Sequence, residues 1–172
     1  MPKLTGVPDA NISPQGSGEY PMDNHLDLLD VQEIELMYNP KKVTSCKVRG
    51  SKDASNIFRK FYDDRLIQYK EFFWIMLLNN SNHVIGMKKI SEGGMTGTVV
   101  DVRVVMAVGL KSAATGMILC HNHPSGALKP SDNDIVLTKK LKEAGQILNI
   151  NVLDHVILTV DGYYSFADEG MM

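Results

Sequence analysis

The chain has 172 residues, of which 44% are hydrophobic and 22% are charged. This size suits one hydrophobic core rather than two, so we expect a single domain with appendages. The sequence holds no run of eighteen apolar residues and no secretory signal at its start, which excludes a membrane span and favours a cytoplasmic protein without a membrane partner. Only two cysteines are present, Cys46 and Cys120, which excludes a disulfide framework and a four-cysteine zinc module and predicts reduced thiols.

The charges are unevenly distributed around a net charge of −2. Residues 1–40 hold one basic and seven acidic side chains, whereas residues 41–70 hold nine basic and three acidic ones. A basic segment of this kind can contact the phosphates of nucleic acid. The alternative, favoured by the acidic segment beside it, is an ordinary solvated face.

The first predicted elements follow a tail. Residues 1–30 are acidic and poor in apolar side chains, which predicts a flexible tail before a domain over residues 31–172. Alternating apolar residues predict a strand at 34–38, which the sequence "NPKK" turns into a second strand at 43–48. Ser51 suits the N-cap of a helix whose apolar positions recur at helical spacing: Ala54, Ile57, Phe58, Phe61 and Tyr62.

Strands and helices alternate through the rest of the chain. The apolar run "EFFWIMLLN", residues 71–79, predicts a strand buried on both faces, and residues 83–90 are expected to pair with it as a hairpin. A glycine-rich loop at 91–98 is followed by a helix at 101–110, a strand at 116–123, a helix at 131–148, and strands at 150–160 and 163–166. This order predicts an α/β fold with a mixed β-sheet flanked by helices on both faces.

The strongest functional signal is the segment "CHNHPSGALKPSDND", residues 120–134. Side chains two apart on a strand share a face, so His121 and His123 are expected to point together, away from Cys120 and Asn122. Asp134 follows in the first turn of the next helix. Two imidazoles and a carboxylate are a suitable ligand set for a catalytic zinc site, whose fourth position stays open.

Several alternatives apply to this segment and its neighbours. The spacing Ser131-x-x-Asp134 also matches a helix capping box, although capping does not account for two histidines. Nucleobase deaminases need H-x-E with P-C-x-x-C, and thermolysin-like proteases need H-E-x-x-H; neither pattern occurs. Asp154 and His155 begin an apolar strand, where one of them could orient a ligand histidine, but a structural role is favoured for both.

The spacing of H-x-H, seven residues, Ser, two residues and Asp resembles the JAMM motif of JAB/MPN-type metalloproteases. The fuller pattern "HNHPSG…PS..D..LTKKL", with "LDHVIL" and "YYSFADEG", is similar to the RadC branch over about residues 33–170. This resemblance implies a JAB/MPN fold of cytidine-deaminase-like architecture and an association with DNA repair. It also implies that His121, His123 and Asp134 hold one zinc ion per chain.

The resemblance implies two catalytic residues as well. Glu71 would be the general base that takes a proton from water and passes it to a leaving amine, and Ser131 would donate its hydroxyl to the developing oxyanion. Glu71 is assigned from the resemblance alone, because nothing in its local sequence distinguishes it from Glu92 or Glu143. The expected function is a zinc-dependent hydrolase, metallopeptidase- or isopeptidase-like, for which a protein or peptide is a possible substrate.

Two other functions are kept as hypotheses. The first is a DNA-binding or nuclease-like accessory factor of DNA repair or recombination that contacts nucleic acid through residues 41–70. Larger RadC-like proteins carry an N-terminal helix-hairpin-helix region, which residues 1–30 cannot form. The second is a catalytically silent scaffold, against which the intact histidine pair and Asp134 argue. The sequence does not predict the oligomeric state.

Overall fold

The computed structural model describes residues 46–63, 65–94 and 99–172. Its elements are α1 (Ser51–Arg59), β1 (Phe72–Leu78), β2 (Val84–Glu92), α2 (Val102–Lys111), β3 (Gly116–Asn122), α3 (Asp132–Ile147), β4 (Asn151–Leu158) and β5 (Tyr163–Ser165). Each was predicted within a few residues of these bounds. The predicted tail and the predicted strand at 34–38 lie outside the described residues.

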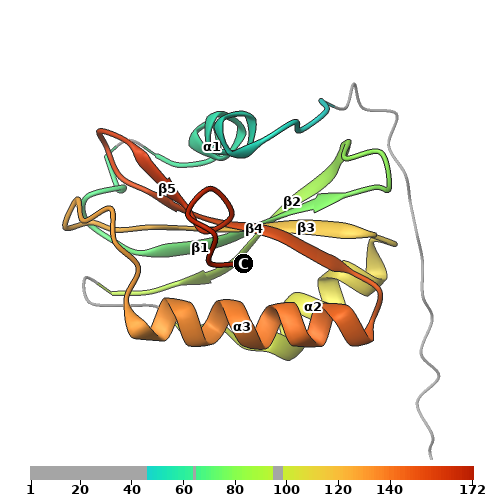
Figure 1. Cartoon of the computed structure of the whole chain (residues 1–172). Helices are drawn as coiled ribbons and strands as arrows, with labels where there is room; N and C mark the ends of the chain where they lie inside the picture. Colours follow the sequence, from blue (N-terminus) through green and yellow to red (C-terminus); the bar gives the residue numbers. More distant parts are fainter. Residues whose placement is uncertain (1–45, 64, 95–98) are drawn as a thin grey trace, which may run out of the picture. The chain divides into compact units, whose positions relative to one another are not determined.

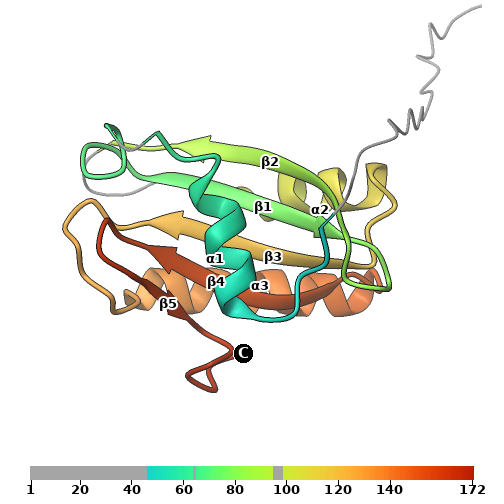
Figure 2. The same ribbon diagram turned by 90° about the horizontal axis from the view of Figure 1, so that it is seen from above.

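The five strands form one mixed sheet in the order β2-β1-β3-β4-β5. Neighbouring strands are antiparallel except β3 and β4, which are parallel and are connected by α3, as a parallel crossover requires. Figures 1 and 2 show α1 lying across one face of the sheet and α2 and α3 covering the other. The predicted fold class is therefore confirmed.

Each face of the sheet has its own apolar core, because alternate residues of a strand point to opposite faces. On the α1 face, Phe58 and Met76 belong to one buried cluster, and on the α2–α3 face, Phe73 and Leu141 belong to another. The predicted burial of β1 on both faces is confirmed, with Trp74 as its one half-buried residue. The paired cores fix the sheet between the helices and so fix the end of β3, where the histidine pair lies.

The N-cap predicted for the first helix is wrong. Gly50, not Ser51, is the N-cap residue of α1, and no side chain caps the helix. Ser51 is the first helical residue, and its hydroxyl donates to Asp168 Oδ2 at 2.6 Å. A carboxylate distant in sequence has thus replaced the local partner that the prediction assumed. Phe61 lies beyond the end of this short helix and is 46% exposed rather than buried.

The strand predicted at residues 43–48 is described only from residue 46, where it is reduced to a single bridge between Lys47 and His83. Val48 N donates to Asn82 O, and Val84 N donates to Cys46 O. This segment therefore contacts the start of β2.

Among the described residues, no helix combines the length and the apolar character that crossing a bilayer requires.

An irregularity in β4 determines toward which face of the sheet Asp154 and His155 point. The register passes from Met117–Val152 to Ile118–Asp154, so Leu153 is an extra residue in β4, a β-bulge. Asp154 consequently shares the α1 face with Ile118, while His155 shares the α2–α3 face with Leu119. The bulge therefore turns the His155 ring toward the face that carries His121.

Candidate metal site

The structure brings the three predicted ligand residues together at the end of β3 and the start of α3. The Nε2 atoms of His121 and His123 lie 2.9 Å apart. Asp134 Oδ1 lies 3.2 Å from His121 Nε2, and Asp134 Oδ2 lies 3.5 Å from His123 Nε2. These three residues could hold a metal ion, because each offers a ligand atom and all of these atoms lie within 4.8 Å of one another.

The site is buried on one side and open on the other. The side chain of His121 is 1% exposed, whereas those of His123 and Asp134 are 14% and 13% exposed. The Asn122 side chain is buried among partners on the opposite side of β3, as the alternation predicted. The site is therefore reached by solvent at His123 and Asp134 and closed at His121.

Asp134 also makes the capping box that was kept as an alternative. Ser131 is the N-cap of α3, its Oγ accepts from Asp134 N, and Asp134 Oδ2 accepts from Ser131 N at 2.7 Å. The Ser131 hydroxyl donates to the same Oδ2 at 2.6 Å. Capping and facing the histidines are therefore compatible, because the cap orients the carboxylate toward both Nε2 atoms.

A chain of hydrogen bonds fixes which nitrogen of His121 carries a proton. Thr138 Oγ1 donates its single proton to Asp134 O at 2.6 Å, so toward His155 Nδ1, also at 2.6 Å, it can only accept. His155 Nδ1 is therefore protonated, and its Nε2 accepts from His121 Nδ1 at 2.8 Å. It follows that the neutral His121 ring presents an unprotonated Nε2 to the site.

The same reasoning applies to His123. Its Nδ1 lies 2.8 Å from Ala127 O in the loop before α3. A carbonyl oxygen can only accept, so Nδ1 of His123 carries the proton and Nε2 of the neutral ring has a free lone pair. Both histidines thus direct lone pairs at one point, where a carboxylate also directs its oxygens.

Three acceptor groups that converge in this way repel one another unless a cation lies between them. The hydrogen bond to Asp134 raises the pKa of His123 in spite of its partial burial. Burial raises the pKa of the Asp134 carboxyl, but hydrogen bonds from His121, His123 and Ser131 outweigh this and hold it well below its usual range. Both shifts favour a protonated imidazole beside an ionised carboxylate when the cluster holds no metal.

His155 gives the metal-free protein a predicted pH dependence. Burial, assisted by the nearby His121, lowers the pKa of His155 well below its ordinary value of 6.5. Below about pH 6.5 the unfolded chain binds a proton at this ring that the folded chain does not. The free energy of unfolding therefore decreases as the pH is lowered, by up to about 1.4 kcal/mol per pH unit. Urea unfolding between about pH 7 and about pH 5 should therefore show a steeper loss for the wild type than for His155→Gln. Parallel curves would contradict this.

Glu71, the predicted general base, lies beside the cluster but not in it. β1 and β3 are antiparallel, their ladder ends with Phe73 opposite His121, and Glu71 comes two residues before Phe73. Partial burial raises the pKa of Glu71, with opposing effects of His121 and His123 and a further rise from Asp134. The carboxyl of Glu71 is therefore within electrostatic reach of all three ligand residues.

A model of the RadC-like JAB domain matches residues 48–171. The chain belongs to the RadC-like JAB family. Curated relatives are UPF0758 proteins: that of Flavobacterium johnsoniae is 49% identical over 146 residues, 85% of this chain and 60% of its own length. The protein of Porphyromonas gingivalis is 43% identical over 104 residues, 60% of this chain and 46% of its own length. The RadC-like chain thus spans less than two-thirds of these relatives.

The basic segment of this RadC-like JAB chain is partly described. In residues 46–63 and 65–70, several cations have partners: Arg65 pairs with Asp63 at 2.7 Å, and Lys70 pairs with Glu92 at 3.0 Å. Arg59 Nη2 donates to Gly162 O at 2.7 Å. These pairs fit a solvated face, and Lys41 and Lys42 lie outside the described residues. Nucleic-acid binding by residues 41–70 stays a prediction.

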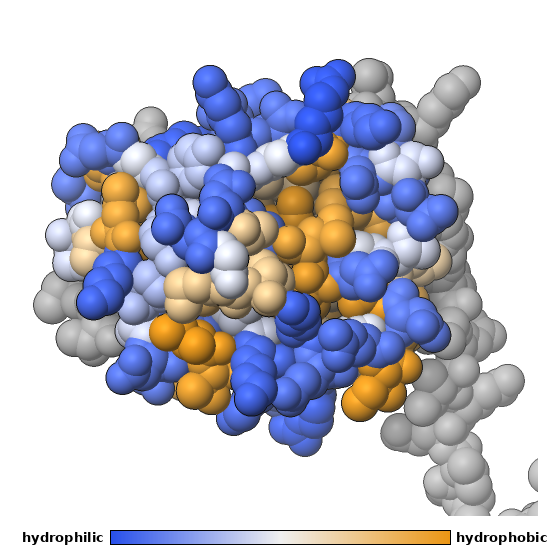
Figure 3. All heavy atoms as spheres, viewed as in Figure 1, coloured by the Kyte–Doolittle hydropathy of each residue, from blue (hydrophilic) through white to orange (hydrophobic). Residues whose placement is uncertain are grey.

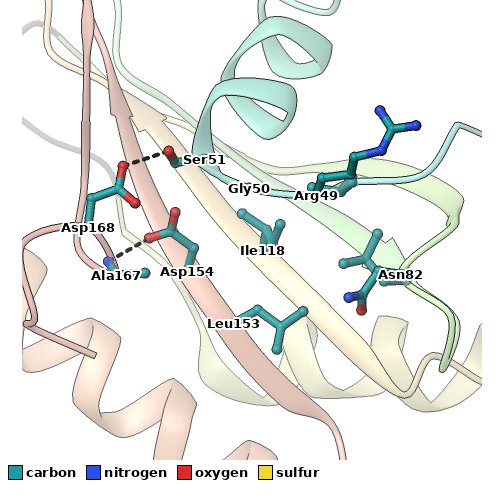
Figure 4. A pocket seen from close by; sticks show the side chains of 11 residues that line it. Arg49, Gly50, Ser51, Asn82, Ile118, Leu153, Asp154, Ala167 and Asp168 are labelled. Atoms are coloured by element: carbon teal, nitrogen blue, oxygen red, sulfur yellow. Dashed lines mark hydrogen bonds between the residues drawn. The ribbon is translucent and has the colours of Figure 1, made fainter.

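A separate cavity of about 200 Å³ lies on the α1 face of the RadC-like JAB fold, lined by residues that include Arg49, Ile118 and Leu153. Its carboxylates already have partners, since Asp154 accepts from Ala167 N and Asp168 accepts from Ser51 (Figure 4). Figure 3 shows apolar side chains gathered in the middle of the face seen in Figure 1, with polar ones around them. Among the described residues, the converging ligand set is His121, His123 and Asp134, and none of these lines the cavity.

Asp154 and His155 have different surroundings, although the sequence suggested a structural role for both. Asp154 is structural: it accepts from Ser165 Oγ at 2.7 Å and from Ala167 N at 2.9 Å on the α1 face. His155 instead contacts the ring of His121. Thr138 was not predicted as part of the site, although its place four residues after Asp134 on a helix could have suggested a shared face.

Proposed function

We propose that this chain is a zinc-dependent hydrolase of the JAMM type, metallopeptidase- or isopeptidase-like. The observation that carries the proposal is the convergence of His121 Nε2, His123 Nε2 and the Asp134 carboxylate at separations of 2.9, 3.2 and 3.5 Å. Membership of the RadC-like JAB family supports it. The substrates and partners of the whole protein are part of the proposal, since the chain spans only part of its relatives.

The residues present fit zinc in both chemistry and spacing. Zinc accepts imidazole nitrogen and carboxylate oxygen at about 2.0–2.2 Å, and a tetrahedral arrangement then sets the ligand atoms roughly 3.3–3.6 Å from one another. The separations of 2.9, 3.2 and 3.5 Å, of which the last two go to different oxygens of Asp134, are close to this range. Nδ1 of His121 is hydrogen-bonded to the His155 ring, and Nδ1 of His123 is hydrogen-bonded to Ala127 O. Both imidazole rings are therefore already oriented, and the site needs little rearrangement to bind zinc.

The chain's own residues supply the proton transfers. Zinc at this site would supply Lewis-acid activation of a water molecule at neutral pH. The raised pKa of Glu71 suits a group that takes a proton from that water and returns it to a leaving amine. The Ser131 hydroxyl would donate to the oxyanion only after it has left Asp134 Oδ2. Asp134 Oδ2 would then still accept a hydrogen bond from the backbone N–H of Ser131.

Metal analysis tests the proposal. Protein loaded with zinc and freed of excess should hold one ion per chain, and His121→Ala should lose it, because two ligands cannot replace three. His83→Ala is the matched control, since His83 lies at the start of β2 and its backbone, not its ring, forms the bridge to Lys47. Zinc that is retained in His121→Ala would contradict the proposal.

A further inference from the structure

Asn122 lies between the two histidines in the sequence but serves the opposite face of β3. It is completely buried and makes three side-chain hydrogen bonds. Its Nδ2 donates to Ile67 O and to Lys70 O, both at 2.7 Å, and its Oδ1 accepts from Phe72 N at 2.8 Å. These partners belong to the segment that leads into β1.

The amide of Asn122 has only one possible orientation. Two of its partners are carbonyl oxygens, which only accept, and the third is a backbone N–H, which only donates. A flipped amide would set its oxygen against two carbonyls and its nitrogen against the N–H of Phe72. A flipped amide would therefore lose all three bonds at once.

These bonds fix the backbone on both sides of Glu71. The carbonyl of Lys70 and the N–H of Phe72 bond to Asn122, which replaces the backbone of a neighbouring strand where the β1–β3 ladder has ended at Phe73 and His121. On the other edge, Glu71 O accepts from Gly93 N at 2.8 Å, and Glu71 N donates to Gly94 O at 3.3 Å. Glu71 is thus the one residue between two backbone groups that Asn122 holds.

We propose that Asn122 is the positioning residue that holds Glu71 beside the metal ligands. The inference rests on the proposed function, because it assigns Glu71 a place in the same site. Asn122 is the last residue of β3, directly after His121 and directly before His123, so movement of the ligand histidines and of the general base is coupled through one residue. An apolar residue of similar size would fill the space but would leave Lys70 O and Phe72 N without these bonds.

Paramagnetic NMR of cobalt-loaded protein tests the position of Glu71 without any substrate. Carboxyl-labelled glutamate is observed, and the Glu71 signal is assigned by its loss in Glu71→Gln. In the wild type, cobalt should broaden this signal strongly, and in Asn122→Ala the broadening should fall several-fold while one cobalt ion stays bound. The matched control is Ser165→Ala, which removes a buried hydrogen bond to Asp154 Oδ2 and a partly buried one from Asp168 N, both away from Glu71, and should leave the broadening unchanged.

The outcomes separate this inference from the proposed function. Equal broadening in wild type and Asn122→Ala would overturn the positioning role, whereas absence of cobalt binding in the wild type would overturn the metal site itself. If Asn122→Ala does not fold, Asn122→Ser, which keeps one hydroxyl, takes its place. Hydrogen exchange of the wild type gives a further check: the Phe72 amide should be protected, and exchange at the rate of an exposed loop would overturn the proposal.

Discussion

On the proposed function, replacing Glu71 by glutamine should lower the rate of hydrolysis at least a hundredfold while leaving one zinc ion bound. Glutamine keeps the size of the side chain but cannot accept and return a proton, and loss of a general base lowers the rate by about a hundredfold to ten-thousandfold. Metal binding should persist because Glu71 lies outside the group of converging ligand atoms found among the described residues. The separation of these two effects distinguishes a base from a metal ligand.

The measurement is hydrolysis of a library of peptide and isopeptide bonds, with zinc content determined on the same samples. Glu143→Gln is the matched control, because Glu143 is an exposed residue of α3 and the change in charge is identical. The control should hydrolyse at the wild-type rate. Undiminished hydrolysis by Glu71→Gln would remove Glu71 from the mechanism and leave its raised pKa without a catalytic meaning.

Replacing Gly145 by alanine should destabilise the fold more than most single substitutions. A Cβ at this position of α3 would lie only 2.3 Å from the backbone oxygen of Ile150 and 3.2 Å from a methyl group of Val152. Backbone cannot move aside without separating α3 from the start of β4. We expect a loss of about 2 kcal/mol or more, even though alanine favours a helix over glycine by about 1 kcal/mol.

Gly109 is the matched comparison for Gly145, because it is also a buried glycine within a helix. A Cβ there would meet the side-chain ends of Ile150 and Met117, both at 3.1 Å, and these flexible ends can shift. Gly109→Ala should therefore change the free energy of unfolding by less than about 1 kcal/mol. Urea unfolding of the two variants compares them directly, and equal stabilities would contradict the close approach of α3 to β4.

The parts of the fold that the sequence predicted depend on local signals. Alternation along β3 was enough to place His121 and His123 on one face, and the serine three residues before Asp134 was enough to predict the start of α3. The apolar run that makes up β1 likewise identified a strand covered on both faces. These signals lie within one element or at its boundary.

The parts that the sequence did not predict depend on contacts between distant segments. The extra residue Leu153 turns His155 toward His121, and nothing in the apolar pattern of β4 marks that position. Asn122 bonds to a segment more than fifty residues earlier in the chain, and Ser51 to a carboxylate near its end. Glu71 was identified from the resemblance to the family, because its nearness to the histidines depends on the packing of distant segments and not on its local sequence.

The central claim is that three side chains coordinate one metal ion. Its most direct test is anomalous X-ray scattering at the zinc edge from zinc-saturated crystals. A single peak should lie about 2.0–2.2 Å from His121 Nε2, His123 Nε2 and a carboxylate oxygen of Asp134. Crystals that show no peak among these three residues, or show zinc only on other side chains, would contradict the account.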